Sequence, residues 1–279
     1  MRTVRSADVT SLVEEMCVKS CIFLPEDVAA AVDCAFENET SRAAKDALGD
    51  IIKNREIASE DSLPMCQDTG MVCVFVKIGQ EVYVEGPLED SINEGVRRGY
   101  TKGYLRKSVV GDPLERKNTG DNTPACIYYR IVPGDALEIT VAPKGAGSEN
   151  MSSIAMLSPA DGEDGIKRFI IEAVKRADAN PCPPIIVGVG IGGNFDKAAL
   201  HSKLALLRPL NECNTDPRYA ILEKELTDSI NALGIGAMGY GGQTTCLGVN
   251  IIAAPTHIAM LPVAVNINCH CARHISGKL

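Results

Sequence analysis

The chain has 279 residues, a formal net charge of −8 and an apolar fraction of 45%, enough for a large buried core in one domain or two lobes. The acidic balance argues against binding to nucleic acid, and no apolar run approaches the roughly 18 residues that a membrane helix needs. Because the N-terminus carries acids and lacks an apolar signal core, we expect a cytoplasmic protein whose 11 cysteines are not disulfides.

The N-terminal part of the chain, up to about residue 60, is predicted to be helical, and the first helix should start from an N-cap at Ser6. A buried strand is expected over 71–79 and a helix over 87–105. The runs 126–132 and 136–142 have the pattern of two paired strands, joined across a Pro-Gly-Asp turn.

The C-terminal half alternates between helical and strand patterns. The run PPIIVGVGIGG predicts a buried strand that ends in a Gly-rich turn. Helices are expected over 162–178, 195–207 and 216–233, and strands near 246–254 and 261–268. Such interleaving predicts an α/β class of mixed α+β character, with a helical N-terminal region.

We expect one catalytic domain over residues 1–279. The stretch 109–124 is rich in Gly, Pro, Asn and Asp, and is the best candidate for a loop between two lobes, 1–108 and 125–279. No internal repeat or low-complexity linker suggests any other division.

Two loop segments carry unusual chemistry. The segment 63–70, Leu-Pro-Met-Cys-Gln-Asp-Thr-Gly, places a thiol, an amide and a carboxylate in one turn before a predicted strand. Such loops are common catalytic positions, although a solvated turn with a buried Cys66 would have the same pattern.

The small residues of 144–150, Lys-Gly-Ala-Gly-Ser-Glu-Asn, would let backbone N–H groups approach an anion. An ordinary strand-to-helix loop capped by Ser148 is the alternative.

Cys182 lies between prolines in Asn-Pro-Cys-Pro-Pro, and this rigid setting suits a metal ligand better than a packing role. The Gly turn that follows also matches the GxGxxG pattern of dinucleotide sites. The match is weak, because Glu212, at the spacing of the expected acidic residue, falls in a predicted loop. A nicotinamide-dependent dehydrogenase is therefore a minor alternative.

The C-terminal run carries His257 in Ala-Pro-Thr-His and, after an apolar strand, Cys269-His-Cys271. Two cysteines around a histidine could bind zinc, but no second close pair supplies the usual spacing of a structural zinc site. A single histidine such as His257 is more often structural than catalytic, so the residues alone leave both interpretations open.

Taken together, these segments resemble the class I, iron-dependent fumarases and the related tartrate dehydratases, and most closely the alpha subunit of the two-subunit forms. The resemblance covers nearly the whole chain. Its motifs occur in family order at family-like spacings: MCQDTG at 65–70, KGAGSEN at 144–150, CPP with IGG at 182–193, NALGIGAMGYGGQTT at 231–245 and PTHIAMLPVAVNINCHC at 255–271.

The resemblance implies that Cys66, Cys182 and Cys269 ligate a [4Fe–4S] cluster, with Cys271 as the alternative to Cys269. Electron-transfer clusters usually have four cysteine ligands. Three ligands would leave one iron open, and that iron could act as a Lewis acid on a bound hydroxy acid.

The resemblance also implies roles for five further residues. Asp68 and His257 would handle the protons of the substrate hydroxyl, while Gln67 and Gly147 would orient the substrate. Arg106 would hold a carboxylate as a bidentate fork. His257 and Arg106 fall at family spacings, twelve residues before the third cysteine and forty after the first.

The function implied is a hydro-lyase: the alpha subunit of a fumarate hydratase, which interconverts fumarate and L-malate. The nearest alternative is the alpha subunit of L(+)-tartrate dehydratase, which converts tartrate to oxaloacetate. An alternative of another class is a non-catalytic iron–sulfur or zinc scaffold that acts as a sensor. For the enzymes, a separate beta subunit would complete the site for a small dicarboxylate in an α2β2 assembly, and neither nucleic acid nor membrane is an expected partner.

Overall fold

The computed structural model describes residues 2–279, and this range contains both helices and mixed sheets, which confirms the α/β class. None of the helices in that range is long and apolar enough to cross a bilayer. The chain divides into two compact units, each made of separate stretches, and the loop 109–124 lies inside the first of them. The first unit contains the chain up to Pro25, residues 54–146 and residues 273–279, and the second contains residues 26–53 and 147–272.

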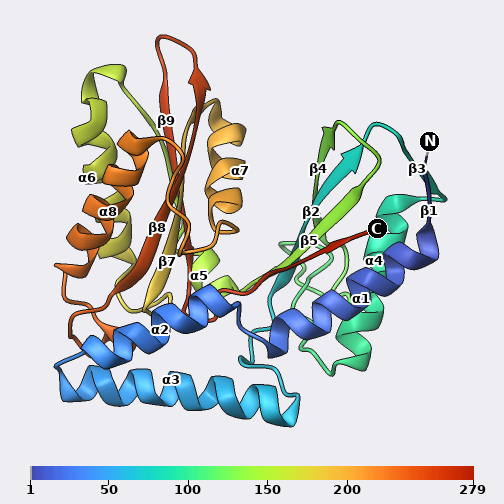
Figure 1. Cartoon of the computed structure of the whole chain (residues 1–279), viewed down its shortest axis with the longest axis horizontal. Helices are drawn as coiled ribbons and strands as arrows, with labels where there is room; N and C mark the ends of the chain where they lie inside the picture. The colour runs from blue at the N-terminus through green and yellow to red at the C-terminus, as the bar shows by residue number, and fades with distance from the viewer. Residues whose placement is uncertain (1) are drawn as a thin grey trace. The chain divides into compact units, whose positions relative to one another are not determined.

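The first unit is built on a four-stranded sheet in the order β10-β5-β2-β4. Its strand β2 (Met71–Gly79) is apolar and buried along most of its length, as expected of an interior strand. Helices α1 (Ser6–Ile22) and α4 (Leu88–Lys102) lie side by side and share a core with the sheet (Figure 1). The other strands are β1 (Arg2–Arg5), β3 (Val82–Glu85), β4 (Cys126–Val132), β5 (Leu137–Lys144) and β10 (Ile275–Lys278).

The predicted pairing of 126–132 with 136–142 is wrong: both strands exist, but they flank β2 instead of contacting each other. β4 runs parallel to β2, and β5 runs antiparallel to it. The connection between them crosses the end of β2, where Gly79 N–H donates to Ala136 O at 2.9 Å. A Cβ at Gly79 would lie 2.2 Å from Gly134 O, so only glycine fits beneath the connection.

The predicted N-cap at Ser6 is also wrong. Ser6 is the first residue of α1, and Arg5 takes the N-cap position without a side-chain cap. The cause is the small parallel pair of β1 and β3, in which Arg5 pairs with Glu85 and stays extended until the helix begins.

The second unit is built on a sheet in the order β6-β9-β7-β8, in which β7 (Ile185–Gly193) has β8 (Cys246–Thr256) and β9 (Leu261–Asn268) as neighbours. Figure 1 shows α7 on one face of this sheet and α6 with α8 on the other. α3 and α5 each contain a boundary between the units. The remaining elements are α2 (Glu26–Asn38), α3 (Arg42–Asp61), α5 (Ala146–Glu149), β6 (Ser153–Leu157), α6 (Gly162–Ala177), α7 (Phe195–Ala205) and α8 (Pro217–Asn231).

The glycines of β7 serve packing, and the expected Gly-rich turn is continuous strand up to Gly193. A Cβ at Gly188 would lie 2.1 Å from Ser202 O, and one at Gly190 would lie 2.1 Å from Ala198 O. Glycine therefore lets α7 pack close against the strand. Because the helix covers these glycines, they cannot cradle a dinucleotide, and the dehydrogenase alternative loses its basis.

We expect Gly188→Ala to lower the free energy of unfolding by about 1–3 kcal/mol, because the added methyl overlaps the backbone of α7. Urea unfolding followed by circular dichroism measures this change. Gly49→Ala is the control: its Cβ would lie 3.4 Å from the Phe36 ring, and alanine is favoured inside a helix by about 0.5–1 kcal/mol. Equal stabilities for the two variants would contradict the packing role.

Candidate functional site

The first candidate segment is the loop from Cys66 to Gly70, here called the Cys66 loop, which leads into β2 in the first unit. Asp68 N–H donates to Cys66 Sγ at 3.4 Å. The Asp68 carboxylate accepts Gly70 N–H at 3.0 Å on Oδ1 and Ala146 N–H at 2.8 Å on Oδ2. The loop therefore fixes a half-buried thiol next to an oriented carboxylate, with the exposed Gln67 between them.

Buried side chains from distant segments also hold the backbone carbonyls of the loop. Tyr100 OH donates to Thr69 O at 2.6 Å, and Arg273 Nη2 donates to Asp68 O at 2.5 Å. Reasoning from the sequence missed both supports, because no local pattern around them indicates a bond to a loop so far away along the chain.

Arg106 lies beside the Cys66 loop. Its carbonyl accepts the Thr69 hydroxyl at 2.8 Å, while the residue itself is exposed at the end of the turn after α4. An exposed guanidinium in this place can form a two-pronged contact with a carboxylate. Within the first unit, the structure thus brings together four of the candidate residues: Cys66, Gln67, Asp68 and Arg106.

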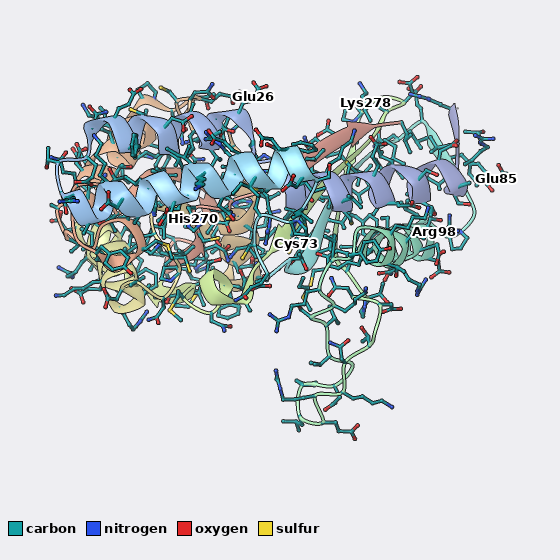
Figure 2. The ribbon with its side chains drawn as sticks, turned by 90° about the horizontal axis from the view of Figure 1, so that it is seen from below. Glu26, Cys73, Glu85, Arg98, His270 and Lys278 are labelled. Atoms are coloured by element: carbon teal, nitrogen blue, oxygen red, sulfur yellow. The ribbon has the colours of Figure 1, made fainter. Side chains whose placement is uncertain are left out.

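In the second unit, Cys182 and Cys269 lie at the same end of the sheet's strands. Cys182 precedes β7, Cys269 follows β9, and Ile186 pairs with Asn268 in antiparallel register. His270, labelled in Figure 2, joins the two segments: its backbone N–H donates to Cys182 O at 3.4 Å and its ring Nδ1 lies 3.0 Å from the same oxygen. Cys182 is exposed and Cys269 is half-buried.

The Cys269-His-Cys271 run does not have the form of a zinc site. The His270 ring contacts the Cys182 carbonyl, and Cys271 is only 7% exposed. A structural zinc ion needs thiolates and imidazoles that converge on one point. The burial of Cys271 also makes Cys269 the better candidate for a ligand that faces a bound group.

Burial separates the candidate thiols from the deeply packed cysteines, although Cys34, Cys126 and Cys213 are as accessible as the candidates. It raises the pKa of Cys17 well above its usual range and that of Cys246 to about 12, so these thiols stay protonated and are poor metal ligands. Cys66, Cys182 and Cys269 are exposed or half-buried. Within residues 2–279, no three Cys, His, Asp or Glu side chains are gathered closely enough to hold a metal ion, so the three-cysteine set stays a prediction.

His257 lies at the opposite end of the second unit's sheet. It is exposed in the turn from β8 to β9, directly after Thr256, which pairs with Gly193 at the end of β7. Because β7 has nine residues, its length separates His257 from Cys182 and Cys269 by about 30 Å. Within one chain, the structure does not bring His257 together with these two cysteines.

Gly147 lies in the short helix α5 with no left-handed backbone angle. Among the described atoms, a Cβ at this position would meet nothing closer than Asn180 O, at 3.8 Å. Neither backbone conformation nor packing in this unit requires glycine here. Space for a methyl group is left beside the backbone, as the expected contact with a substrate requires.

A family profile and two relatives point to one family. The sequence profile of the fumarate hydratase (Fumerase) family matches residues 10–278. A protein of Methanocaldococcus jannaschii, provisionally named L(+)-tartrate dehydratase subunit alpha, is 44% identical over 278 residues, which cover 97% of each chain. The L(+)-tartrate dehydratase subunit alpha of Escherichia coli K12 is 33% identical over 250 residues, which cover 88% of this chain and 82% of the relative.

Proposed function

This chain belongs to the fumarate hydratase (Fumerase) family of hydro-lyases, and on that premise we propose that it is the alpha subunit of an iron–sulfur enzyme that interconverts fumarate and L-malate. The observation that carries the proposal is the Cys66 loop, in which backbone N–H groups bond the Cys66 thiol and the Asp68 carboxylate, with the exposed Gln67 amide between them. A sensor or scaffold needs no such set, and membership in a family of enzymes leaves that alternative without support.

Cys66, Cys182 and Cys269 are the residues that would hold a [4Fe–4S] cluster. Bound by three cysteines, such a cluster supplies a Lewis-acidic iron to the hydroxyl and carboxylate of a hydroxy acid. The donor set fits, because thiolates are the ligands that iron–sulfur clusters select, and Asp68 N–H already donates to one of the three sulfurs. We place the protein in the cytoplasm, whose reducing conditions keep such thiols free.

The other residues act on the substrate. Asp68, with its carboxylate held in one orientation, exchanges a proton with the substrate hydroxyl. Arg106 binds a carboxylate through its guanidinium, Gln67 orients the substrate through its amide, and Gly147 leaves it room. None of these groups is assigned to the carbon-bound proton, which we assign to a base on a separate beta subunit.

His257 completes the proposed set from a second copy of this chain. The sheet keeps it about 30 Å from Cys182 and Cys269, too far for any side chain to bridge within one chain. The same end of the sheet exposes Ile258 (93%) and Phe195 (60%), apolar surface that a second copy would cover. The proposed α2β2 assembly supplies that copy.

L(+)-tartrate is the second candidate substrate, and the names of the relatives favour it. Tartrate and L-malate both carry two carboxylates and a hydroxyl beside one of them, and they differ by one further hydroxyl. The proposed residues can hold the shared groups of both. Discrimination therefore rests on contacts to the further hydroxyl, and an assay must decide between the two.

The test is anaerobic co-expression with the beta partner. The relatives are named as alpha subunits, so we propose a beta subunit here too and expect little activity from this chain alone. We expect iron and sulfide in the assembled enzyme and turnover of L-malate or L(+)-tartrate. Full turnover by the chain alone would contradict the proposed beta subunit. An anaerobic preparation without iron and sulfide would contradict the proposed iron–sulfur function.

Exposure to air is expected to inactivate the assembled enzyme, and anaerobic incubation with ferrous iron and thiol should restore it. The reason is that an iron without a protein ligand is the one most easily lost to an oxidant or chelator. The measurement follows activity and the absorbance of the cluster in parallel. Activity that survives prolonged aeration and chelator would contradict a cluster with an open iron.

Gly147→Ala is expected to lower kcat/KM by roughly 10–200-fold, the effect of one misplaced methyl in a fitted site. Stability should hardly change, because among the described residues, chain neighbours aside, the atom nearest to the new methyl is Asn180 O at 3.8 Å. Gly111→Ala is the control, since its Cβ would also meet open space, 3.9 Å from Lys117 O, outside the proposed site. Unchanged kinetics in Gly147→Ala would remove Gly147 from the substrate contacts.

A further inference from the structure

Arg273 is a buried cation beneath the Cys66 loop. It is 3% exposed, and its Nη2 donates to Asp68 O at 2.5 Å. Arginine is almost never buried so deeply unless its hydrogen bonds and its charge are compensated. The position of Arg273 therefore requires an explanation, and the Cys66 loop, whose Asp68 carbonyl it bonds, is the place to look for it.

Three consecutive carbonyls of the Cys66 loop each accept a hydrogen bond from a buried side chain, so the underside of the loop is held at every residue from 68 to 70. Of these three donors, Arg273 is the one that carries charge. The bonds run from Arg273 to Asp68 O, from Tyr100 OH to Thr69 O at 2.6 Å, and from Asn122 Nδ2 to Gly70 O at 3.2 Å.

The charge of Arg273 acts on its surroundings. Burial raises the pKa of Cys21 and Tyr100, and the Arg273 guanidinium opposes that rise in both by favouring the anion. Cys21 also lies within electrostatic range of Cys66 and Asp68. A fixed positive charge thus lies against the loop that carries the Cys66 thiol and the Asp68 carboxylate.

We propose that Arg273 is a positioning residue, which fixes the backbone of Asp68 from below and offsets the negative charge of the thiolate ligands that the Cys66 loop helps to supply. Its hydrogen bond keeps the Asp68 carboxylate and the Cys66 thiol in their orientation. Its charge favours the bound, anionic state of the ligand set. The second part rests on the proposed iron–sulfur function, and the first part does not.

The first experiment compares Arg273→Gln and Arg273→Lys in the anaerobically assembled enzyme. We expect the Gln variant to hold its iron and sulfide roughly 10–100-fold more weakly, the effect typical of groups that support metal ligands, and to lose them faster in air. The Lys variant keeps the charge and should recover part of the difference. If both variants retain wild-type iron content and rates of loss, the charge has no role.

The second experiment uses the chain without its cluster, so it does not depend on the proposed function. Hydrogen exchange should become faster at Gly70 and Ala146, whose N–H groups bond the Asp68 carboxylate, when Arg273 is replaced by Gln. Unchanged exchange at these two amides would overturn the positioning role. Wild-type enzyme without iron would overturn the proposed function instead, so the two failures are distinguishable.

Arg208→Gln is the matched control for both experiments. Arg208 lies in the second unit, where its Nη2 bonds Glu223 at 2.7 Å and Asn250 at 2.6 Å. We expect its loss and the loss of Arg273 both to lower the urea midpoint, but the loss of Arg208 should leave iron content and the exchange of Gly70 unchanged. If Arg208→Gln weakens iron binding as much as Arg273→Gln, the effect is general destabilisation and the proposal falls.

Discussion

Asp68→Asn will lower kcat/KM of the assembled enzyme by roughly 10²–10⁴-fold, the usual effect of losing a general acid or base. The carboxylate is held by Gly70 N–H and Ala146 N–H, one on each oxygen, and therefore presents one fixed orientation to a substrate. An asparagine must turn its NH2 group towards one of these donors, so the replacement removes both the ionisable oxygen and its alignment. Anaerobic steady-state kinetics, with iron and sulfide measured on the same sample, separates lost catalysis from lost cofactor.

Asp112→Asn is the matched control. Asp112 Oδ1 also accepts two backbone N–H groups, from Leu114 and Glu115 at 2.8 Å each, in the loop after α4 that projects from the first unit (Figure 2). This variant should lose a similar amount of local order and no activity. Wild-type kcat/KM in Asp68→Asn, with a full complement of iron, would show that another group handles the hydroxyl proton.

Local pattern predicts those features whose cause is local. The buried strand over 71–79 and the strands near 246–254 and 261–268 are confirmed, because long apolar runs rich in Val and Ile favour interior strands. Cys66 and Asp68 share a loop for the simpler reason that they are two residues apart, so their proximity did not depend on the fold.

The errors arise where a distant partner decides the outcome. The pairing of 126–132 with 136–142 followed from the turn between them, but β2, which precedes both in the chain, takes both as its neighbours. The glycines of β7 have the local sequence pattern of a turn, and their packing role becomes visible only in the contact with α7. No sequence motif marks Arg273. Its bond to Asp68 depends on the C-terminal segment 273–279 being part of the first unit.

Mixed assemblies of two inactive chains, one Asp68→Asn and one His257→Asn, will recover activity. If His257 acts on the site of the neighbouring alpha chain, a mixed pair has one site with both residues intact and one site with neither. An isolated mixed pair should then have about half of the wild-type activity, since the two sites of a symmetric dimer are equivalent. Two different affinity tags, used in succession, isolate that pair.

The reciprocal pair is the control. One wild-type chain combined with one chain carrying both Asp68→Asn and His257→Asn has a single substitution in each site if His257 acts across chains, and should be nearly inactive. If both residues act within one chain, the pair of single variants should be nearly inactive and the reciprocal pair should have about half of the wild-type activity. Comparing the two pairs therefore decides between the arrangements. The roughly 30 Å length of β7 between His257 and Cys182 makes the arrangement across chains the one we expect. Activity only in the reciprocal pair would place His257 in the site of its own chain and would overturn the proposed arrangement.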